Sequence, residues 1–236
     1  MFGFALDTGG EPEMITLIDH VNNLEGRYPI TYKKVRLMNV HNTPTLVSAI
    51  KTSSEMYQNN GLVCRLDHEN NIISSTFISS IKISKSKKGL ILNGFVWTHP
   101  KGYQKAMDMK LNNEINEKNV WKKFQKDELQ GWLAYALNTG KKPEKNRENI
   151  TVRINGNDFH NLDGFFCTLG EEINGISGYF GRNLPALYDS LRGDFGVKSI
   201  SELNWTNHMR SKVLLKSKFT KILEIFEDYS IKIVLN

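Results

Sequence analysis

The chain has 236 residues, enough for one large domain or two modest ones, and its 39% hydrophobic and 24% charged residues are typical of a globular protein. No apolar run approaches the roughly 18 residues that indicate a membrane-spanning helix. The first residues also lack the basic start of a signal peptide, so we expect a cytoplasmic protein without a membrane partner. Because Cys64 and Cys167 lie far apart and outside any metal-binding spacing, we expect two reduced, buried thiols and neither metal nor cofactor.

The net charge of +6 is unevenly distributed along the chain. Residues 1–147 hold 21 Lys and Arg against 14 Asp and Glu, whereas residues 148–236 hold 10 against 11. A basic half can attract nucleic acid or an acidic partner. The lysines are scattered without a clear stripe, however, so we favour the simpler interpretation that they keep the domain solvated.

The first part of the chain is predicted to be a strand-rich α+β domain. Its β-forming, partly alternating segments predict strands at Ile30–Val40, Ile72–Ser84 and Leu90–Thr98. The polar turn with a glycine between the last two segments predicts a hairpin. A helical segment follows at Asn116–Asn138, and a change of phase in its apolar positions predicts a break near Asp127–Gly131.

The polar and charged stretch that follows this helical segment predicts a domain boundary. It contains a glycine and a proline and nothing that can pack in a core, so it is typical of a linker. We therefore expect a first domain at 1–140, a linker at 141–149 and a second domain at 150–236.

The second domain is predicted to be a small α/β fold. A strand at 151–154 precedes a helix whose apolar residues recur at helical spacing from Leu162 to Ile173. A glycine-rich loop and a second helix come next, and the expected later elements are a strand at 197–203, helices at 207–212 and 216–229, and a branched strand at 231–235, dense enough to be central. This order predicts a small parallel three-stranded sheet with helices packed on it.

The second helix of this domain presents an aspartate to solvent. Asn183 is a strong candidate for its N-cap, and the leucines at 184, 187 and 191 form its core face. Asp189 lies well away from them, so with Tyr179 and Tyr188 it can form one surface, a carboxylate with an aromatic rim typical of an interface hot spot. The simpler alternative is a solvated carboxylate paired with Arg192.

This segment resembles the signature of the barstar family of ribonuclease inhibitors. Tyr179–Leu191 has the signature's aromatic pair, glycine, Asn-Leu, Ala-Leu, aromatic, aspartate and later leucine in order. Ile154-Asn-Gly at the first strand, Thr168-Leu169 in a helix and the branched C-terminal strand agree with it. The resemblance covers about residues 148–236 and leaves the first 140 residues outside it.

The resemblance implies that the protein blocks the active site of a ribonuclease while still inside the producing cell. In that family the helix aspartate occupies the place of a substrate phosphate, so Asp189 takes this role here. The resemblance implies a partner-binding set of Tyr179, Gly181, Asn183, Leu184, Tyr188, Asp189 and, more loosely, Asp228.

Three departures from the family pattern bear on the partner. Pro185 replaces a second helix acid, Arg182 and Arg192 add positive charge beside Asp189, and Asp194 replaces a later aromatic residue. Substitutions that repel one partner are a common means of specificity. We therefore expect a cognate nuclease toxin other than the family's usual enzyme.

Two other classes of function remain as alternatives. The basic first domain would make the protein a nucleic-acid-binding protein with the second domain as an adaptor, and salt-dependent RNA binding by that domain would favour this class. An enzyme is not expected, because the six histidines show no hydrolase motif or metal spacing.

Overall fold

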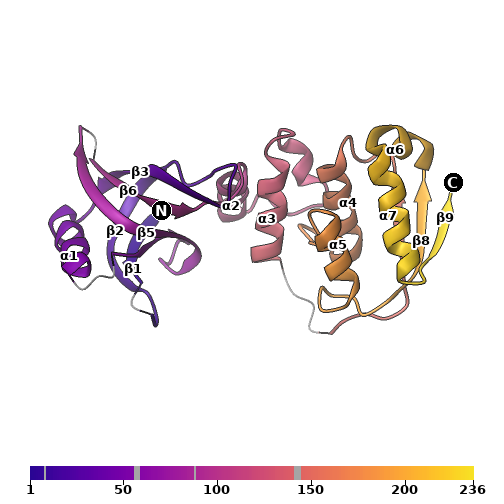
Figure 1. Ribbon diagram of the computed structural model, residues 1–236, viewed down its shortest axis with the longest axis horizontal. Helices are drawn as coiled ribbons and strands as arrows, with labels where there is room; N and C mark the ends of the chain where they lie inside the picture. The colour runs from indigo at the N-terminus through magenta and orange to yellow at the C-terminus, as the bar shows by residue number, and fades with distance from the viewer. Residues whose placement is uncertain (8, 56–58, 88, 141–144) are drawn as a thin grey trace. The chain divides into compact units, whose positions relative to one another are not determined.

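The computed structural model describes residues 1–7, 9–55, 59–87, 89–140 and 145–236. Its contacts divide the chain into two compact units, Met1–Pro100 and Lys101–Asn236 (Figure 1). No helix in these ranges has the length and apolar character needed to cross a membrane. Both cysteines are buried and unpaired, as the sequence predicts, and burial raises the pKa of Cys64 to about 11.

The first unit is a closed barrel of six antiparallel strands in the order β1-β2-β3-β6-β5-β4. A helix, α1, connects β3 to β4 and packs on β1 and β2. The bounds are β1 Phe2–Leu6, β2 Glu13–Asn22, β3 Ile30–Val40, α1 Thr43–Glu55, β4 Gly61–Leu66, β5 Ile72–Ser86 and β6 Gly89–Trp97.

The barrel follows from alternation along its strands. In β3, Val35 and Leu37 are buried in the core with Phe4 and with Leu46 of α1, whereas Lys34 and Arg36, which alternate with them, are exposed.

The three strands and the hairpin predicted from the sequence are confirmed. Sequence reasoning missed β1, β2, β4 and α1. Gly3 interrupts the apolar pattern of β1, Glu13 and Asp19 interrupt that of β2, and β4 has only six residues.

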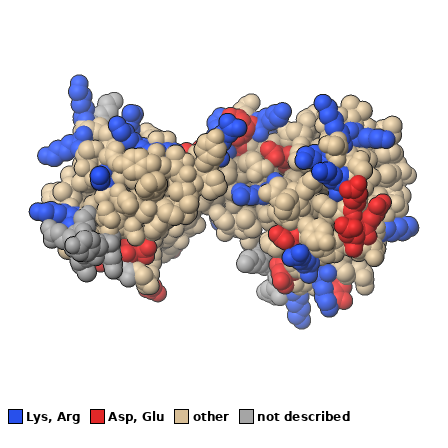
Figure 2. All heavy atoms as spheres, in the orientation of Figure 1, with Lys and Arg blue, Asp and Glu red and all other residues tan. Residues whose placement is uncertain are grey.

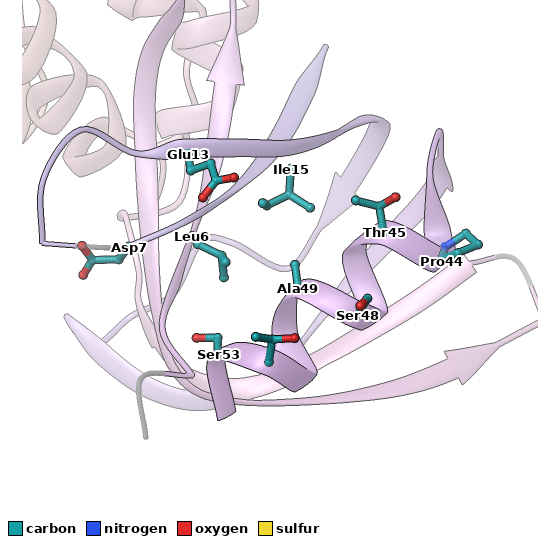
Figure 3. A pocket seen from close by; sticks show the side chains of 10 residues that line it. Leu6, Asp7, Glu13, Ile15, Pro44, Thr45, Ser48, Ala49 and Ser53 are labelled. Atoms are coloured by element: carbon teal, nitrogen blue, oxygen red, sulfur yellow. The ribbon is translucent and has the colours of Figure 1, made fainter. Parts of the chain in front are cut away.

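A pocket of about 760 Å³ opens between α1 and the first two strands (Figure 3). Its wall is apolar at Leu6, Ile15 and Ala49. On the side formed by α1, the pocket is also lined by hydroxyl-bearing residues, among them Thr45 and Ser48. The carboxylates of Asp7 and Glu13 lie at the end where the turn between β1 and β2 begins. The pocket is thus a mixed apolar and acidic hollow of the first unit.

The second unit contains a parallel three-stranded sheet in the order β7-β8-β9. Figure 1 shows α4, α5 and α7 on one side of this sheet, with α3 beyond α4. The bounds are α2 Tyr103–Leu111, a 3₁₀ helix η1 Val120–Lys123, α3 Leu129–Thr139, β7 Ile150–Asn155, α4 Leu162–Asn174, α5 Leu184–Leu191, β8 Ile200–Thr206, α6 His208–Leu215, α7 Ser217–Asp228 and β9 Lys232–Leu235.

The expected α/β fold of the C-terminal region is confirmed, with one correction to its sheet. The last strand lies at an edge, and β8 occupies the centre. Leu203 and Trp205 of β8 are fully buried, whereas Ile233 and Val234 of β9 are only half-buried. A run of branched residues therefore indicated a strand correctly but did not fix its position in the sheet.

The division between the units falls before α2, earlier than the linker expected from the sequence. The helical segment forms two pieces, η1 and α3, separated near the expected break, and both group with the second unit. Every residue of Leu129–Ala136 except Gln130 is buried, and α3 packs on α4. A helix that is apolar on nearly all sides must be covered, which explains why it joins the second unit.

The expected linker at 141–149 is only partly described, since 141–144 lie outside the described residues. Arg147, in its remaining part, is tied to the second unit. Its backbone N–H donates to the carbonyl of Gly196 at 3.1 Å, and its guanidinium donates to the carbonyl of Ile173. Residues 145–149 therefore lead directly into β7.

We predict that a fragment of residues 101–236 is markedly more stable than one of residues 150–236. The shorter fragment exposes the apolar surface that Trp121 and α3 cover, and each large apolar side chain contributes about 1.5–3 kcal/mol when buried. Thermal unfolding of the two fragments, followed by circular dichroism, measures the difference. Equal melting temperatures would show that α2, η1 and α3 are not part of this folding unit.

Candidate functional site

The site begins at the N-terminus of α5, where Asn183 caps the helix as the sequence predicts. Its Oδ1 accepts a hydrogen bond from the backbone N–H of Ala186 at 2.8 Å, and Pro185 occupies the first turn. Leu187 is fully buried, whereas Leu184, predicted for the same core face, is only half-buried. The cap therefore fixes where α5 starts. The side of α5 opposite Leu187 faces solvent.

Asp189 projects from the exposed side of α5. Its side chain is 65% exposed, and its Oδ1 lies 3.5 Å from Nη1 of Arg192, one turn later. An exposed ion pair of this kind contributes only about 0–1 kcal/mol. The carboxylate can therefore exchange Arg192 for another cation at little cost.

Tyr188 lies beside Asp189 and is held by α7. The rings of Tyr188 and Tyr229 meet edge to face with centroids 5.1 Å apart, and the Tyr229 hydroxyl donates to the Tyr188 carbonyl at 2.9 Å. The guanidinium of Arg192 lies 5.4 Å from the centre of the Tyr188 ring. Tyr188 is still 37% exposed, so it offers an aromatic surface next to the carboxylate.

Asp228, the most distant of the predicted site residues, is the last residue of α7 and is exposed. It immediately precedes Tyr229, whose ring packs on Tyr188. No hydrogen bond or ion pair links Asp228 to another residue within the described ranges. The structure therefore brings it to the α7 flank of the site without joining it to Asp189.

Tyr179 is placed differently from the exposed aromatic residue expected at the rim. It is only 9% exposed, and its ring packs on Phe195 with centroids 5.7 Å apart. Burial raises the pKa of its hydroxyl, an effect that nearby Arg182 opposes and Asp189 reinforces. Tyr179 therefore supports the loop from beneath, with its hydroxyl close to the charges of the exposed surface.

Glycines allow the loop before α5 to take its path. Gly181 has a φ of +91°, and a Cβ atom there would lie 2.9 Å from the backbone nitrogen of Leu187. Gly178 lies so close to Gly170 of α4 that a Cβ atom on either would clash with the carbonyl oxygen of the other. The positive φ of Gly181 and the close backbone contact between Gly170 and Gly178 explain why glycine is needed at these positions, independently of any partner that the loop binds.

A buried carboxylate, Glu171 of α4, connects this loop to the segment before α3. Glu171 is 3% exposed. Its Oε2 accepts from the N–H of Asn119 at 2.7 Å and from Nε1 of Trp121 at 3.2 Å, and its Oε1 accepts from the N–H of Ser177 at 3.2 Å. Burial raises its pKa, and these donors partly offset that effect. One carboxylate thus joins η1, α4 and the glycine-rich loop.

Two amide side chains hold the rest of the loop. Nε2 of Gln130, on α3, donates to Oδ1 of Asp163 at 2.8 Å and to the carbonyl of Arg182 at 3.1 Å. Nδ2 of Asn174 donates to the carbonyls of Tyr179 and Phe195 at 2.8 and 3.0 Å. Sequence reasoning missed these groups and Glu171, and the one available signal was a polar residue, Gln130, within an otherwise apolar helix.

The site is thus part of a small parallel α/β fold that presents an exposed helix and a loop held by buried polar groups. Within the described residues, no group of three or more His, Cys, Asp or Glu side chains is arranged to hold a metal ion.

Residues 149–233 match the model of the barstar family, described as Barstar (barnase inhibitor), so the C-terminal region is a barstar-family domain. No curated protein matches the chain. The family match begins after α3, so Trp121 and Gln130 support the loop from outside the matched region.

We predict that Glu171→Gln loosens the loop while leaving the η1 contacts in place. The single amide oxygen can still accept from Asn119 and Trp121, but the amide nitrogen then faces the N–H of Ser177, another donor. An unsatisfied buried donor costs about 1–3 kcal/mol. Amide hydrogen exchange should accelerate at residues 177–183.

Trp121→Phe is the matched control for this prediction, since it removes the indole donor to the same carboxylate, with part of a buried ring, and leaves the bond to Ser177 in place. It should lower the melting temperature without faster exchange in the loop. Equal exchange at residues 177–183 in both variants would contradict a specific role for the bond between Glu171 and Ser177.

Proposed function

We propose that this protein is an immunity protein that binds a cognate nuclease toxin, a ribonuclease, and blocks its active site with the surface formed by the loop 178–183 and α5. The observation that carries the proposal is Asp189, which is 65% exposed on α5 in a domain that matches an inhibitor family. A ribonuclease binds the phosphates of RNA with cationic side chains, and an exposed carboxylate offers them a substitute anion.

The weak pair between Asp189 and Arg192 suits this role. Both side chains of the pair are about two-thirds exposed and lie 3.5 Å apart, so the carboxylate stays accessible in the free protein. In a desolvated cleft, charge-assisted hydrogen bonds to Arg or Lys are shorter and stronger than those at an exposed surface. Exchange of partners would therefore favour the complex.

The clamped loop also supports the proposal. Binding costs free energy when loops and side chains must become ordered, and a surface already held in place avoids part of that cost. Glu171, Asn174 and Gln130 bond the loop at Ser177, Tyr179 and Arg182 respectively.

The charges around Asp189 favour a particular partner. Arg182 and Arg192 lie beside it, and Pro185 stands where a second acid is expected from the family pattern. In the view of Figure 2, acidic side chains gather over α7, the helix that packs on α5. A matched nuclease would place its cations against Asp189 and the α7 side and present no cation to the two arginines.

We predict that Asp189→Ala weakens binding to the cognate nuclease by about 2 kcal/mol or more, roughly 30-fold in Kd, without lowering the melting temperature. The side chain is exposed and its ion pair weak, so folding does not depend on it. Isothermal titration calorimetry of the purified pair measures the loss.

The matched control is Glu148→Ala. Glu148 also carries an exposed carboxylate, 55% exposed and paired with Lys198 at 2.8 Å, but it precedes β7 and belongs neither to the loop 178–183 nor to α5. Glu148→Ala removes one negative charge, as Asp189→Ala does, and should leave the Kd for the nuclease unchanged. Equal losses for both variants would mean that only the overall charge matters.

We predict that Tyr188→Ala weakens the same complex by at least about 1 kcal/mol, because it removes exposed aromatic area beside Asp189. Tyr188→Phe should retain binding, since the contacts of Tyr188 in the structure involve its ring and its carbonyl. If Tyr188→Ala lowers only the melting temperature, Tyr188 belongs to the packing between α5 and α7.

A further inference from the structure

The outer face of three barrel strands carries aromatic and basic side chains in successive rows. The paired positions are Ile30 with Trp97, then Tyr32 with Phe95, then Lys34 with Asn93. On the other side, Asn93 pairs with Lys82 of β5. Side chains two residues apart on a strand share a face at about 7 Å spacing, so the rows follow one another across one continuous surface.

The rings on this face are more exposed than those of a packed core. Tyr32 is 54% exposed, Phe95 46% and Trp97 41%. Tyr32 and Phe95 meet edge to face with centroids 5.2 Å apart, and Trp97 meets Phe77 in the same way at 4.8 Å. In these pairs one ring stands against the edge of the other, so part of each ring face stays open to a further aromatic group.

Basic residues adjoin the rings, and the strands themselves carry no acid. The segments Ile30–Val40, Ile72–Ser86 and Gly89–Trp97 contain five Lys and Arg residues and not one Asp or Glu. Lys34 and Lys82 are exposed, and neither forms an ion pair with any residue that the structure describes. Figure 2 shows further Lys and Arg side chains projecting at the end of the unit where β5 turns into β6.

We propose that this face of β3, β6 and β5 binds single-stranded nucleic acid, with bases stacked on Tyr32, Phe95 and Trp97 and phosphates against Lys34 and Lys82. Exposed aromatic rings next to unpaired cations are the combination that binds single strands without sequence preference. The bases of a duplex are stacked on one another and unavailable to the rings. The lysines appear scattered in the sequence, and the pairing of β5 with β6 and of β6 with β3 brings two of them to opposite sides of Asn93.

This activity belongs to the first unit and is independent of the nuclease-binding surface. It is measured with the full-length protein and no nuclease, by fluorescence anisotropy of labelled oligo(U), oligo(dT) and a duplex, each of about 10 nucleotides. We expect binding of the single strands and much weaker binding of the duplex. The two single strands distinguish RNA from DNA as the natural ligand.

Phe95 variants test stacking against general apolar contact. Phe95→Leu keeps an apolar side chain but loses the ring and should weaken binding about fivefold or more, whereas Phe95→Tyr should retain it. Unchanged binding by Phe95→Leu would overturn the proposal and would leave a face that contacts a protein instead.

Lysine variants test the phosphate contacts. Lys34→Ala and Lys82→Ala should each reduce the slope of log Kd against log salt concentration by about 0.7. Lys51→Ala, which removes an exposed lysine of α1 outside the three strands, should leave the slope unchanged. Equal effects of all three variants, equal affinity for the duplex, or no binding of single strands at low salt would overturn the proposal.

Discussion

The second unit depends on one buried carboxylate. Glu171 of α4 accepts hydrogen bonds from η1 on one side and from the glycine-rich loop on the other, at 2.7–3.2 Å. Placing a charged group in the interior is costly unless donors surround it, and these backbone and indole N–H groups meet that requirement. One of these bonds, from the N–H of Ser177, also holds the glycine-rich loop. The bonds that make it possible to bury Glu171 therefore also help to hold the loop that forms the proposed binding surface.

This constraint links the region outside the family match to the surface within it. Gln130 of α3 bonds the loop at Arg182, and α3 covers α4 with residues that are almost all buried. The barstar-family domain of this chain is therefore supported by elements that precede it in the sequence. An added layer of this kind can hold the loop while Asp189 and its neighbours change to suit a particular partner.

The sequence predicted those features that arise from local patterns. The cap at Asn183, the apolar faces of α4 and α7 and the parallel sheet follow from residue spacing, and the barstar-family match agrees with the residues from Tyr179 to Leu191. The features it missed depend on contacts between distant segments. Glu171 and Gln130 carry no local pattern that shows which residues they bond, and nothing in the sequence around Tyr179 shows that Phe195 covers it.

The first unit shows the same limit. Strands β3, β5 and β6 and the hairpin of β5 with β6 were predicted from the sequence, but the pairing of β6 with β3 was not, and only the two pairings together collect Tyr32, Phe95, Lys34 and Lys82 on one face. The division of the chain likewise depends on what covers α3, because a polar stretch is equally typical of a loop inside a unit and of a linker between units.

The central claim is that the loop and α5 occupy the phosphate-binding cleft of a nuclease. The most direct measurement is calorimetric titration of the purified cognate nuclease with this protein at increasing concentrations of a mononucleotide that occupies that cleft. The account predicts that the apparent Kd rises in proportion to the nucleotide concentration. A Kd that is independent of the nucleotide would show that the protein binds elsewhere on the nuclease and would contradict the account.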